Sequence, residues 1–512
     1  MLKNLLAICS LLTVVLLGSC REDLEYRPSA DTLRFSRDTV FLDTVFNGLS
    51  SSTYNLKVYN TGNDDISIPE VFLELRNNSN FRLNVNGEPG KEFSHVEIPA
   101  KDSIYIFIES TVALNAPATG SFLATDAIIF TDGNSREEVA LVTLIQDAVF
   151  LYPARNNGVV ETIAIGIDED GNELRTEGFE LQDDQLNFTS QLPYVIYGYA
   201  AVPSGKTLEI EAGTRVHFHE ASGILVKDGG SLQVNGAPST DMEIMENEVI
   251  FEGDRLEPEF SDIPGQWGTI WMAEGSINNR IDHLTIKNAT IGIITEGNAE
   301  ATPSKLNMTN SRVLNSANIN IFARNTSLDL TNCIAGSAGQ PSVYLTRGGR
   351  YKFEHCTIAN YWNTGLRSFP ALLIDNFEFT NNESIIAYPL TAAVFNNCII
   401  TGNASVEFLL NRSPEAEFNF NFNHSLLQFN TTSSELVNNP LYDLDDPALY
   451  SNNIINGNPG FVNPADNDYS LLAESDAIDL GDPLLLPSVP TDILGDPRGS
   501  IPDAGAYEYK EN

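Results

Sequence analysis

Hydrophobic and polar residues alternate along most of the chain, in short runs that end at turn residues. Residues 104–108 read Ile-Tyr-Ile-Phe-Ile, and residues 54–59 alternate before the turn Asn60-Thr61-Gly62. Alternation with a period of two is typical of half-buried strands, whereas an amphipathic helix repeats every 3.6 residues. The sequence therefore predicts an all-β protein.

Strands of this kind follow one another closely between residues 32 and 148. Further runs lie at residues 127–130, shortly before Asp132-Gly133, and at residues 138–142. Short strands with frequent turns are typical of a β-sandwich of about 110 residues. The segment VYNTGNDDISI at 58–68 resembles the immunoglobulin-like domains found beside surface solenoids. We therefore expect an immunoglobulin-like β-sandwich at 32–148, followed by a connector or cap at 149–193.

From residue 194 the chain shows strand-sized runs separated by glycine turns, and from residue 280 one sequence frame recurs. A β-stretch leads to Asn or His and then to Leu, Ser or Cys, and this frame returns after 22 to 27 residues, with one interval of 42. Such a period, without a helical pattern, predicts a parallel β-helix in which each coil extends each sheet by about 4.8 Å. We expect this solenoid at 194–435 and a C-terminal coil or cap region at 436–512.

The pair His355-Cys356 belongs to this frame, which argues against catalysis. A catalytic pair occurs once in a site, whereas these two positions recur once in each coil. Asn and His at a bend can hydrogen-bond their counterparts above and below, and Cys or Ser can fill an inward column. The three thiols are an odd number, and we expect them to be free. The predicted structural ladder comprises His283, Asn310, Asn332, His355, Asn397 and His424, with Cys333, Cys356 and Cys398 beside them.

The N-terminus predicts export. Lys3 precedes an apolar run, residues 5–17, that is too short for a comfortable membrane span. Leu17-Gly18-Ser19-Cys20 resembles the bacterial lipobox, which implies a signal peptide at 1–19, lipid attachment at Cys20 and a linker at 20–31. Acyl chains on Cys20 would anchor the protein to a membrane. Arg21-Glu22-Asp23 resembles the export signal of Bacteroidetes surface lipoproteins and implies an outer-membrane location facing the exterior, with a periplasmic orientation as the alternative.

The charge of the chain excludes one class of partner. There are 29 Lys and Arg against 69 Asp and Glu, and removal of Lys3 with the signal leaves 28 − 69 = −41. Nucleic-acid binding depends on phosphate neutralisation by Lys and Arg, so nucleic acids are excluded as partners. An acidic surface also repels polyuronates and anionic lipid heads.

Longer motifs carry a family resemblance. Residues 253–272 (GDRLEPEFSDIPGQWGTIWM) and the following RIDHLTIKNATIGI resemble uncharacterised Bacteroidetes lipoproteins with right-handed parallel β-helix repeats of the pectate-lyase-like fold. The segments AIDLGD, TDILGDPRG and DAGAYEY resemble the terminal motif of bacterial surface β-helix proteins. The resemblance spans roughly residues 194–509 and implies architecture without an activity, because this fold hosts lyases, hydrolases, adhesins and structural proteins.

Motifs for catalysis or metal binding are weak. The sequence has no GHG turn, phosphate loop, Rossmann fingerprint or GxSxG motif. His217 and His219 share a strand face, but catalytic zinc usually needs three ligands, and we expect an outward-facing pair with Val216 and Phe218 inside. Residues 168–172 resemble a calcium loop but fit a hairpin turn better. No cofactor is expected, and Ca²⁺ has no further support.

One enrichment favours glycan binding. Aromatic rings stack on sugars, and arginines form forked hydrogen bonds to hydroxyl or carboxylate groups. Aromatic and arginine residues gather between residues 344 and 367, where exposed loops would make a groove; packing in the core and loops is the alternative. The candidates are Tyr344, Arg347, Arg350, Tyr361, Trp362 and Arg367.

These observations predict a lipid-anchored cell-surface protein. We expect it to bind glycans or to act as an adhesive or scaffold component without catalysis, with a polysaccharide or a surface protein as partner. The alternative is a polysaccharide lyase or glycoside hydrolase whose site is unrecognised. A matched cluster of carboxylates in one groove would favour the enzyme.

Overall fold

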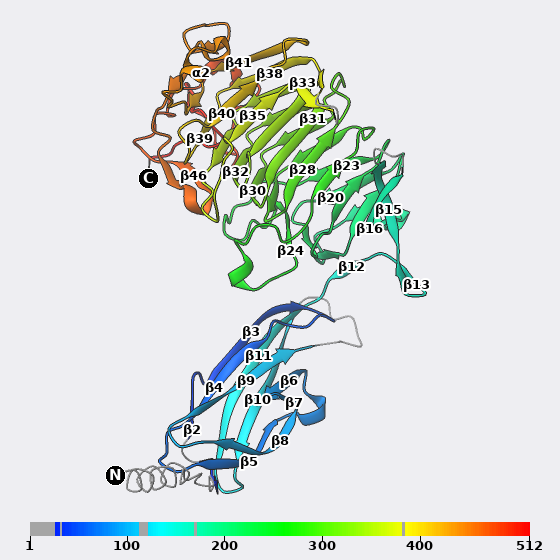
Figure 1. Cartoon of the computed structure of the whole chain (residues 1–512), viewed down its shortest axis with the longest axis vertical. Coiled ribbons are helices and arrows are strands. Elements are labelled where there is room, and N and C mark those ends of the chain that lie inside the picture. Colours follow the sequence, from blue (N-terminus) through cyan, green and yellow to red (C-terminus); the bar gives the residue numbers. More distant parts are fainter. Residues whose placement is uncertain (1–25, 31–32, 112–120, 168–171, 381–383, 512) are drawn as a thin grey trace, which may run out of the picture. The chain divides into compact units, whose positions relative to one another are not determined.

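A computed structural model shows that the chain is all-β (Figure 1). The structure describes residues 26–30, 33–111, 121–167, 172–380 and 384–511, so the expected signal peptide and Cys20 lie outside the described residues. The chain divides between Asp147 and Ala148 into two compact units. Within the described ranges, no helix is long and apolar enough to cross a membrane.

The N-terminal unit consists of two β-sheets that share one apolar core. Alternating strand residues such as Val58, Ile106 and Ile128 are fully buried between the sheets. The six-stranded sheet contains β1 (Arg27–Pro28), β3 (Thr39–Phe46), β5 (Ile66–Leu73), β8 (Glu92–Ile98), β10 (Ser121–Thr131) and β11 (Arg136–Gln146). The five-stranded sheet contains β2 (Leu33–Phe35), β4 (Tyr54–Asn60), β6 (Phe81–Val85), β7 (Glu88–Gly90) and β9 (Ser103–Ser110).

The C-terminal unit contains a long parallel sheet, here called the first sheet. Its strands are parallel and pair in chain order, so each strand lies beside the one before it in the sheet. These strands are β12 (Val149–Leu151), β18 (Tyr194–Ile196), β21 (Arg215–Phe218), β24 (Val249–Gly253), β27 (Leu284–Lys287), β30 (Arg312–Ser316), β32 (Ile334–Ala338), β34 (Thr357–Asn360), β39 (Ile399–Gly402), β42 (Leu426–Leu427) and β44 (Ile454–Ile455).

A second sheet of this unit has 18 strands, and nearly all of its pairs are parallel. Within it, β19 pairs with β22 and β22 with β25, while β20 pairs with β23 and β23 with β26, so alternate strands of the chain are neighbours. They are β15 (Thr162–Ile167), β16 (Glu173–Glu180), β17 (Asn187–Phe188), β19 (Tyr199–Val202), β20 (Thr207–Glu211), β22 (Gly223–Val226), β23 (Ser231–Asn235), β25 (Ile270–Met272), β26 (Asn279–Asp282), β28 (Ile291–Glu296), β29 (Leu306–Thr309), β31 (Ile319–Thr331), β33 (Val343–Glu354), β35 (Leu372–Asp375), β38 (Leu390–Asn396), β40 (Phe408–Asn411), β41 (Phe418–Asn423) and β43 (Tyr450–Ser451).

Smaller elements complete the unit. Three antiparallel pairs are β13 (Arg155–Asn156) with β14 (Val159–Val160), β36 (Phe377–Phe379) with β37 (Ile385–Ala387), and β45 (Phe461–Asn463) with β46 (Asp468–Leu471). The helices of the two units are short: α2 (Ser434–Val437), η1 (Arg76–Asn78), η2 (Asp183–Gln185), η3 (Pro258–Phe260), η4 (Pro440–Tyr442), η5 (Pro464–Asp466) and η6 (Pro483–Leu485).

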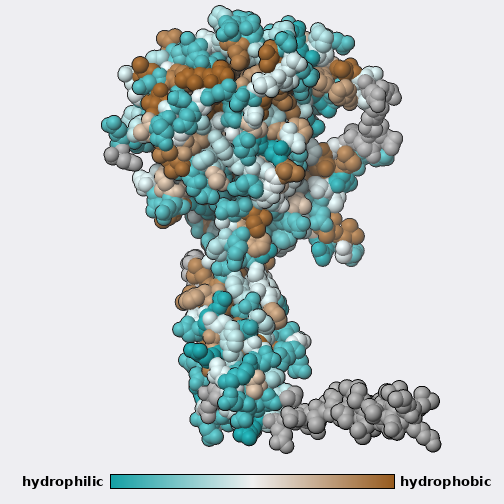
Figure 2. Space-filling model, turned by 60° about the vertical axis from the view of Figure 1, so that its left-hand side comes forward, coloured by the Kyte–Doolittle hydropathy of each residue, from teal (hydrophilic) through white to brown (hydrophobic). Residues whose placement is uncertain are grey.

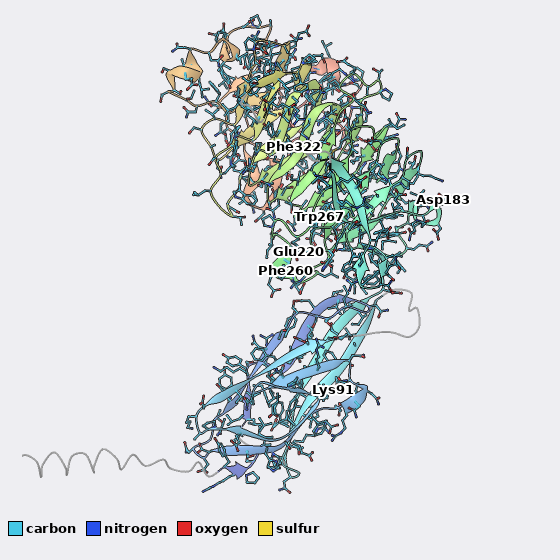
Figure 3. All side chains as sticks on the ribbon, turned by 45° about the vertical axis from the view of Figure 1, so that its right-hand side comes forward. Lys91, Asp183, Glu220, Phe260, Trp267 and Phe322 are labelled. Atoms are coloured by element: carbon cyan, nitrogen blue, oxygen red, sulfur yellow. The ribbon has the colours of Figure 1, made fainter. Side chains whose placement is uncertain are left out.

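Apolar side chains from both long sheets form one continuous core inside the C-terminal unit. Trp267, labelled in Figure 3, is fully buried there and stacks on Phe218, with ring centroids 4.3 Å apart. Its indole N–H donates to the Lys287 carbonyl at 2.9 Å, so its polar edge is satisfied. This stack joins β21 to the segment that precedes β25.

The last part of the chain packs against the outer side of the first sheet. Ile334, Ala359 and Ile399 point out of that sheet and are buried beneath Tyr469 and Ile493 of the C-terminal segment. We use "C-terminal segment" for residues 457–511. It removes an apolar sheet face from water, which is favourable in proportion to the area covered.

Candidate functional site

The predicted ladder residues occupy one backbone conformation. His283, Asn310, Asn332, His355, Asn397 and His424 all have positive φ, between 48° and 54°. Left-handed backbone is unfavourable for most L-residues, and Asn and His are among the side chains that tolerate it best. The recurrence of Asn and His in the sequence frame therefore reflects a bend that each coil repeats.

Ladder side chains also bond from one coil to the next. Asn332 donates its amide to Asn310 Oδ1 at 3.1 Å, and Asn397 Nδ2 lies 2.9 Å from His355 Nε2. Asn452, which sequence reasoning missed, continues the ladder, because its φ is 56° and its amide lies 2.9 Å from His424 Nε2. The frame concealed it because Asn453 follows it in place of Leu, Ser or Cys.

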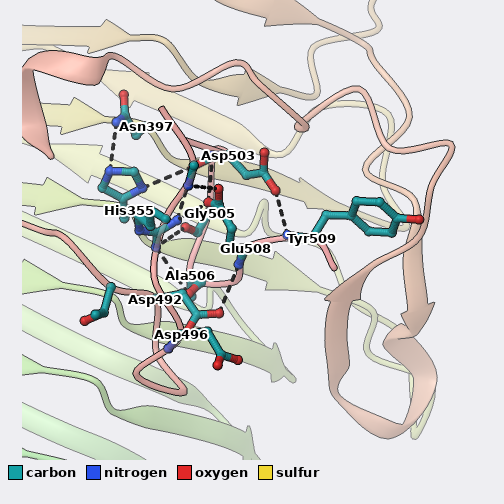
Figure 4. A network of polar contacts seen from close by, with 12 residues as sticks. His355, Asn397, Asp492, Asp496, Asp503, Gly505, Ala506, Glu508 and Tyr509 are labelled. Atoms are coloured by element: carbon teal, nitrogen blue, oxygen red, sulfur yellow. Dashed lines mark hydrogen bonds and ion pairs between the residues drawn. The ribbon is translucent and has the colours of Figure 1, made fainter. Parts of the chain in front are cut away.

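The C-terminal segment is bonded to this ladder (Figure 4). Arg498 donates to Asn332 Oδ1 at 2.9 Å and forms an ion pair with Glu508 at 3.2 Å, and its side chain is fully buried. His355 Nδ1 lies 3.2 Å from the Asp503 carbonyl oxygen. Burial, reinforced by Arg498, lowers the pKa of His355 well below its usual value, and burial raises the pKa of Asp503 to about 6. The imidazole of His355 is therefore neutral, and its contacts are structural.

The cysteines lie in the core. Cys333, Cys356 and Cys398 are free and buried, in line with the prediction of unpaired thiols. Burial raises the pKa of Cys333 and Cys398, which keeps these thiols protonated. Cys356 Sγ contacts the Leu330 and Glu354 carbonyls, whereas the two ring nitrogens of His355 face the Asp503 carbonyl and Asn397, so these contacts do not join the two side chains as a nucleophile and base.

Three of the six glycan-binding candidates lie on β33. The Tyr344 hydroxyl donates to Asp375 Oδ2 at 2.8 Å, and Arg347 forms an ion pair with Glu378. Arg350 lies beyond the bend at residues 347–349 and donates to the Ala301 carbonyl at 2.8 Å. Tyr344 and Arg347 therefore both bond to nearby acidic side chains, those of Asp375 and Glu378. The hydrogen bond of Arg350 goes to a different part of the chain, at Ala301.

The other three candidates follow β34. Tyr361 packs edge-on against Phe461 of the C-terminal segment. Trp362 is half-buried, and its carbonyl accepts a hydrogen bond from Asn403 at 2.9 Å. Arg367 forms a buried ion pair with Glu407, at 2.6 Å. These contacts hold the loop together, so the six candidates do not form one exposed groove.

A different set of side chains forms an exposed row on the second sheet. Trp271, Ile294, Phe322 and Tyr344 are paired in register on β25, β28, β31 and β33, and all four are partly exposed. Their sequence neighbours Ile270, Ile293, Ile321 and Val343 are buried, so the four must point outward. We call this set the aromatic row; Phe322 is labelled in Figure 3.

Aromatic stacking and charge shape the row. The rings of Phe322 and Tyr344 stack with centroids 5.3 Å apart. Two residues further along β28, β31 and β33 lie Glu296, Arg324 and Thr346, and Asp375 of the next strand, β35, extends this polar line. Glu296 and Arg324 form an ion pair, and Thr346 donates to Asp375 at 2.6 Å. Burial raises the pKa of the Asp375 carboxyl.

A pocket of about 490 Å³ lies beside Trp271. Its walls come from β15, β22, β25 and β28, with Lys227 and Glu296 among its charged residues. Among the residues of the aromatic row and of the pocket, only Tyr344 was singled out from the sequence. The signal that could have identified the row is a large outward-facing residue on each of several successive strands. The unequal spacing of these strands along the chain hides which of the residues are aligned.

The histidine pair of β21 departs from the expected outward-facing arrangement. Val216 and Phe218 are in the core as expected, and His219 is exposed, but His217 is buried. Its ring Nδ1 lies 3.7 Å from Glu252 Oε1 and 3.3 Å from the Gly253 carbonyl oxygen, both on the neighbouring strand β24. No group of three or more His, Cys, Asp or Glu among the described residues is placed to hold a metal ion. Residues 168–171 of the proposed hairpin turn lie outside the described residues.

Comparisons with known proteins leave the family open. No family model matches the chain, and no curated protein matches it. Solved structures with partial likeness include a PapD-like domain of human CEP192 (TM-score 0.16, 11% identity, covering 25% of this chain and 94% of that one). A second is the chaperone YadV (TM-score 0.16, 14% identity, 22% and 51%). A third is a family 123 glycoside hydrolase from Clostridium perfringens (TM-score 0.17, 9% identity, 23% and 30%). At these TM-scores the likeness carries no argument about function.

Proposed function

We propose that this chain is a lipid-anchored protein of the bacterial outer surface that binds glycans without cleaving them. In this proposal the N-terminal unit is an immunoglobulin-like spacer attached through Cys20, and the C-terminal unit is a right-handed parallel β-helix that presents the aromatic row. The observation that carries the proposal is the row itself: Trp271, Ile294, Phe322 and Tyr344, in register and partly exposed.

The geometry of the row suits a sugar chain. Neighbouring strands lie about 4.8 Å apart, comparable with the length of one pyranose unit, so successive units can meet successive side chains. Indole and phenyl faces stack on the apolar faces of sugar rings. The adjacent line with Glu296, Arg324 and Thr346 offers donors and acceptors for hydroxyl groups.

The charge of the molecule favours neutral glycans. Acidic residues outnumber basic ones by 40, and hydrophilic side chains predominate on the face shown in Figure 2. Long-range repulsion slows the approach of polyanions to such a surface. A polyuronate is therefore a poor partner, whereas an uncharged or cationic polysaccharide meets no such barrier.

Retention on immobilised polysaccharides tests the proposal. A soluble form that starts at Arg21 is passed over plant, algal and host polymers. Phe322→Ala should weaken retention on the bound polymer at least tenfold, because an exposed aromatic contact is lost from the middle of the row. The melting temperature should change little, since Phe322 is already partly exposed.

Phe379→Ala is the matched control, because Phe379 is an exposed aromatic side chain on the separate β36–β37 pair. It should retain wild-type binding. Equal losses in the Phe322 and Phe379 variants, or no retention of the wild type on any polymer, would contradict the proposal.

One observation favours the enzymatic alternative. Asp375 is buried, accepts hydrogen bonds from Tyr344 and Thr346, and has a pKa raised by burial, as expected for a general acid. The same polymers, with and without Ca²⁺, are therefore followed by chromatography for shorter products. Products that appear with the wild type and disappear with Asp375→Asn would establish a hydrolase or lyase.

A further inference from the structure

One end of the aromatic row is closed by the β15–β16 hairpin. In the row's register, Trp271 is preceded by Leu225 and then by Ala201. Ile163 of β15 packs on both of these earlier residues, and Leu225 is only 3% exposed. The row is therefore open from Trp271 to Tyr344 and blocked before Trp271.

The pocket lies at this closed end. Ala164, Ile165 and Gly166 of the hairpin form one wall, and Trp271 and Leu225 are among the residues of the sheet side. Its volume of about 490 Å³ accommodates a small ligand. A chain that follows the row toward the hairpin would therefore enter the pocket with its last unit and could extend no further along the row.

Charge inside the pocket selects among such units. Lys227 is paired with Glu180 at 2.5 Å, and Glu296 is paired with Arg324. Asp228 and Glu274 also line the pocket. They add two carboxylates to a site in which Lys227 is already paired with Glu180. A uronate would bring a further negative charge next to them, which costs Coulomb energy, whereas a neutral or amine-bearing unit would not.

The wall of the pocket is held from behind by a buried ammonium. Lys305 is 1% exposed and donates to the Ala273 carbonyl at 2.6 Å, to the Glu274 carbonyl at 2.8 Å and to the Glu296 carbonyl. All three of these residues line the pocket. Fixing their backbone before binding reduces the ordering cost of taking up a ligand.

We infer that this pocket binds the terminal unit of a glycan chain, and that this unit is uncharged or carries an amine. The inference rests on the proposed function and adds to it: the protein recognises chain ends, with the aromatic row supporting the units behind the end. Long polymers then bind in proportion to their ends, not to their length.

Three pairs of probes test this inference by calorimetry: xylohexaose and xylan, the glucosamine hexasaccharide and chitosan, and hexagalacturonate and polygalacturonate. At equal mass of sugar, the hexasaccharide of a neutral or amine-bearing pair should occupy at least ten times more protein than its polymer, because it presents more ends. Hexagalacturonate should not bind detectably. Equal occupancy by hexasaccharide and polymer, tighter binding of the uronate, or no binding of any of the six probes would overturn the inference.

Variants separate this pocket from the row. Ala273→Leu places a larger side chain between Lys227 and Glu296, and should reduce hexasaccharide binding at least tenfold. Glu274→Lys, at an exposed pocket residue, should weaken the amine-bearing probe at least tenfold, and Glu435→Lys on α2 provides the same charge change outside the pocket. If Phe322→Ala impairs binding while Ala273→Leu does not, the proposed function stands and chain-end recognition is wrong. If wild-type protein is retained on no polymer of the wider panel, the proposed function itself is wrong.

Discussion

At the ladder positions, the backbone decides which side chains are acceptable. Each repeat of the sequence frame contains a left-handed residue, and His355 and Asn397 occupy that position with side chains that also bond to each other. Such a residue costs most L-amino acids about 1–2 kcal/mol, and Asn and His less. The histidine beside Cys356 is therefore explained by the left-handed backbone of the bend, which its side chain tolerates.

His355 makes stability depend on pH. Its pKa in the folded state lies well below 6.5, so below pH 6.5 the unfolded chain binds a proton that the folded chain does not. Stability therefore falls as the pH falls from 6.5 toward the folded pKa, by at most about 1.4 kcal/mol per pH unit. His355→Asn keeps a side chain that suits the bend and removes this proton, so it should lose less stability than the wild type between pH 7 and pH 5.

Chemical denaturation of both proteins at the two pH values measures this difference. His217, whose pKa is also lowered by burial, is present in both proteins, so the stability of the variant still falls to some extent as the pH falls. Asp503 acts in the opposite direction, because its raised pKa of about 6 adds stability as the pH falls from 6 toward 4. Since both groups are common to the two proteins, identical pH dependence would show that His355 does not carry the effect.

At the scale of elements, the C-terminal segment depends on one buried arginine. Arg498 donates to Asn332 of the ladder and to the Gly505 carbonyl, and pairs with Glu508. Arg498→Met keeps an apolar stem in place of the arginine methylenes but removes the guanidinium that these acceptors bond to. The free energy of unfolding should fall by about 3 kcal/mol, as for other broken buried pairs.

Denaturant unfolding of the Arg498 variant measures this loss, and Lys510→Met is the control. Lys510 also forms an ion pair with an acid of this segment, Asp496, but at the surface. An exposed pair contributes at most about 1 kcal/mol. Equal effects of the two substitutions would contradict the role assigned to Arg498.

The aromatic row is also a property of elements and not of single residues. Trp267 and Trp271 stand four positions apart in one motif, yet the first is in the core and the second is on the surface. Alternation within a strand would point residues four positions apart to the same face, but Trp267 precedes β25 and only Trp271 lies within that strand. Which side chains become neighbours depends on the register between coils, and the 42-residue interval before Cys398 shows how far coil lengths vary.

At the scale of the whole molecule, the two units have separate cores. Separate apolar clusters fill the N-terminal and C-terminal units, with different residues in each. Units with their own cores usually fold independently. Fragments comprising residues 26–147 and 148–512 should therefore each unfold cooperatively, and the intact chain should show two calorimetric transitions at the temperatures of the fragments. A single transition, or a fragment that fails to fold, would indicate that the units depend on one another.

The sequence by itself determined the local features of this protein. Alternation indicated strands, and the recurring Asn or His identified the bend of each coil, because strand pairing and left-handed backbone both leave local signatures in residue type. The free, buried thiols followed from the same frame. Tertiary structure alone decided which distant residues meet. It placed Arg367 in a buried pair with Glu407, brought Arg498 back to Asn332, and aligned Trp271 with Phe322. The physical reason is that these contacts depend on the accumulated length of every intervening coil and loop, which residue type does not encode.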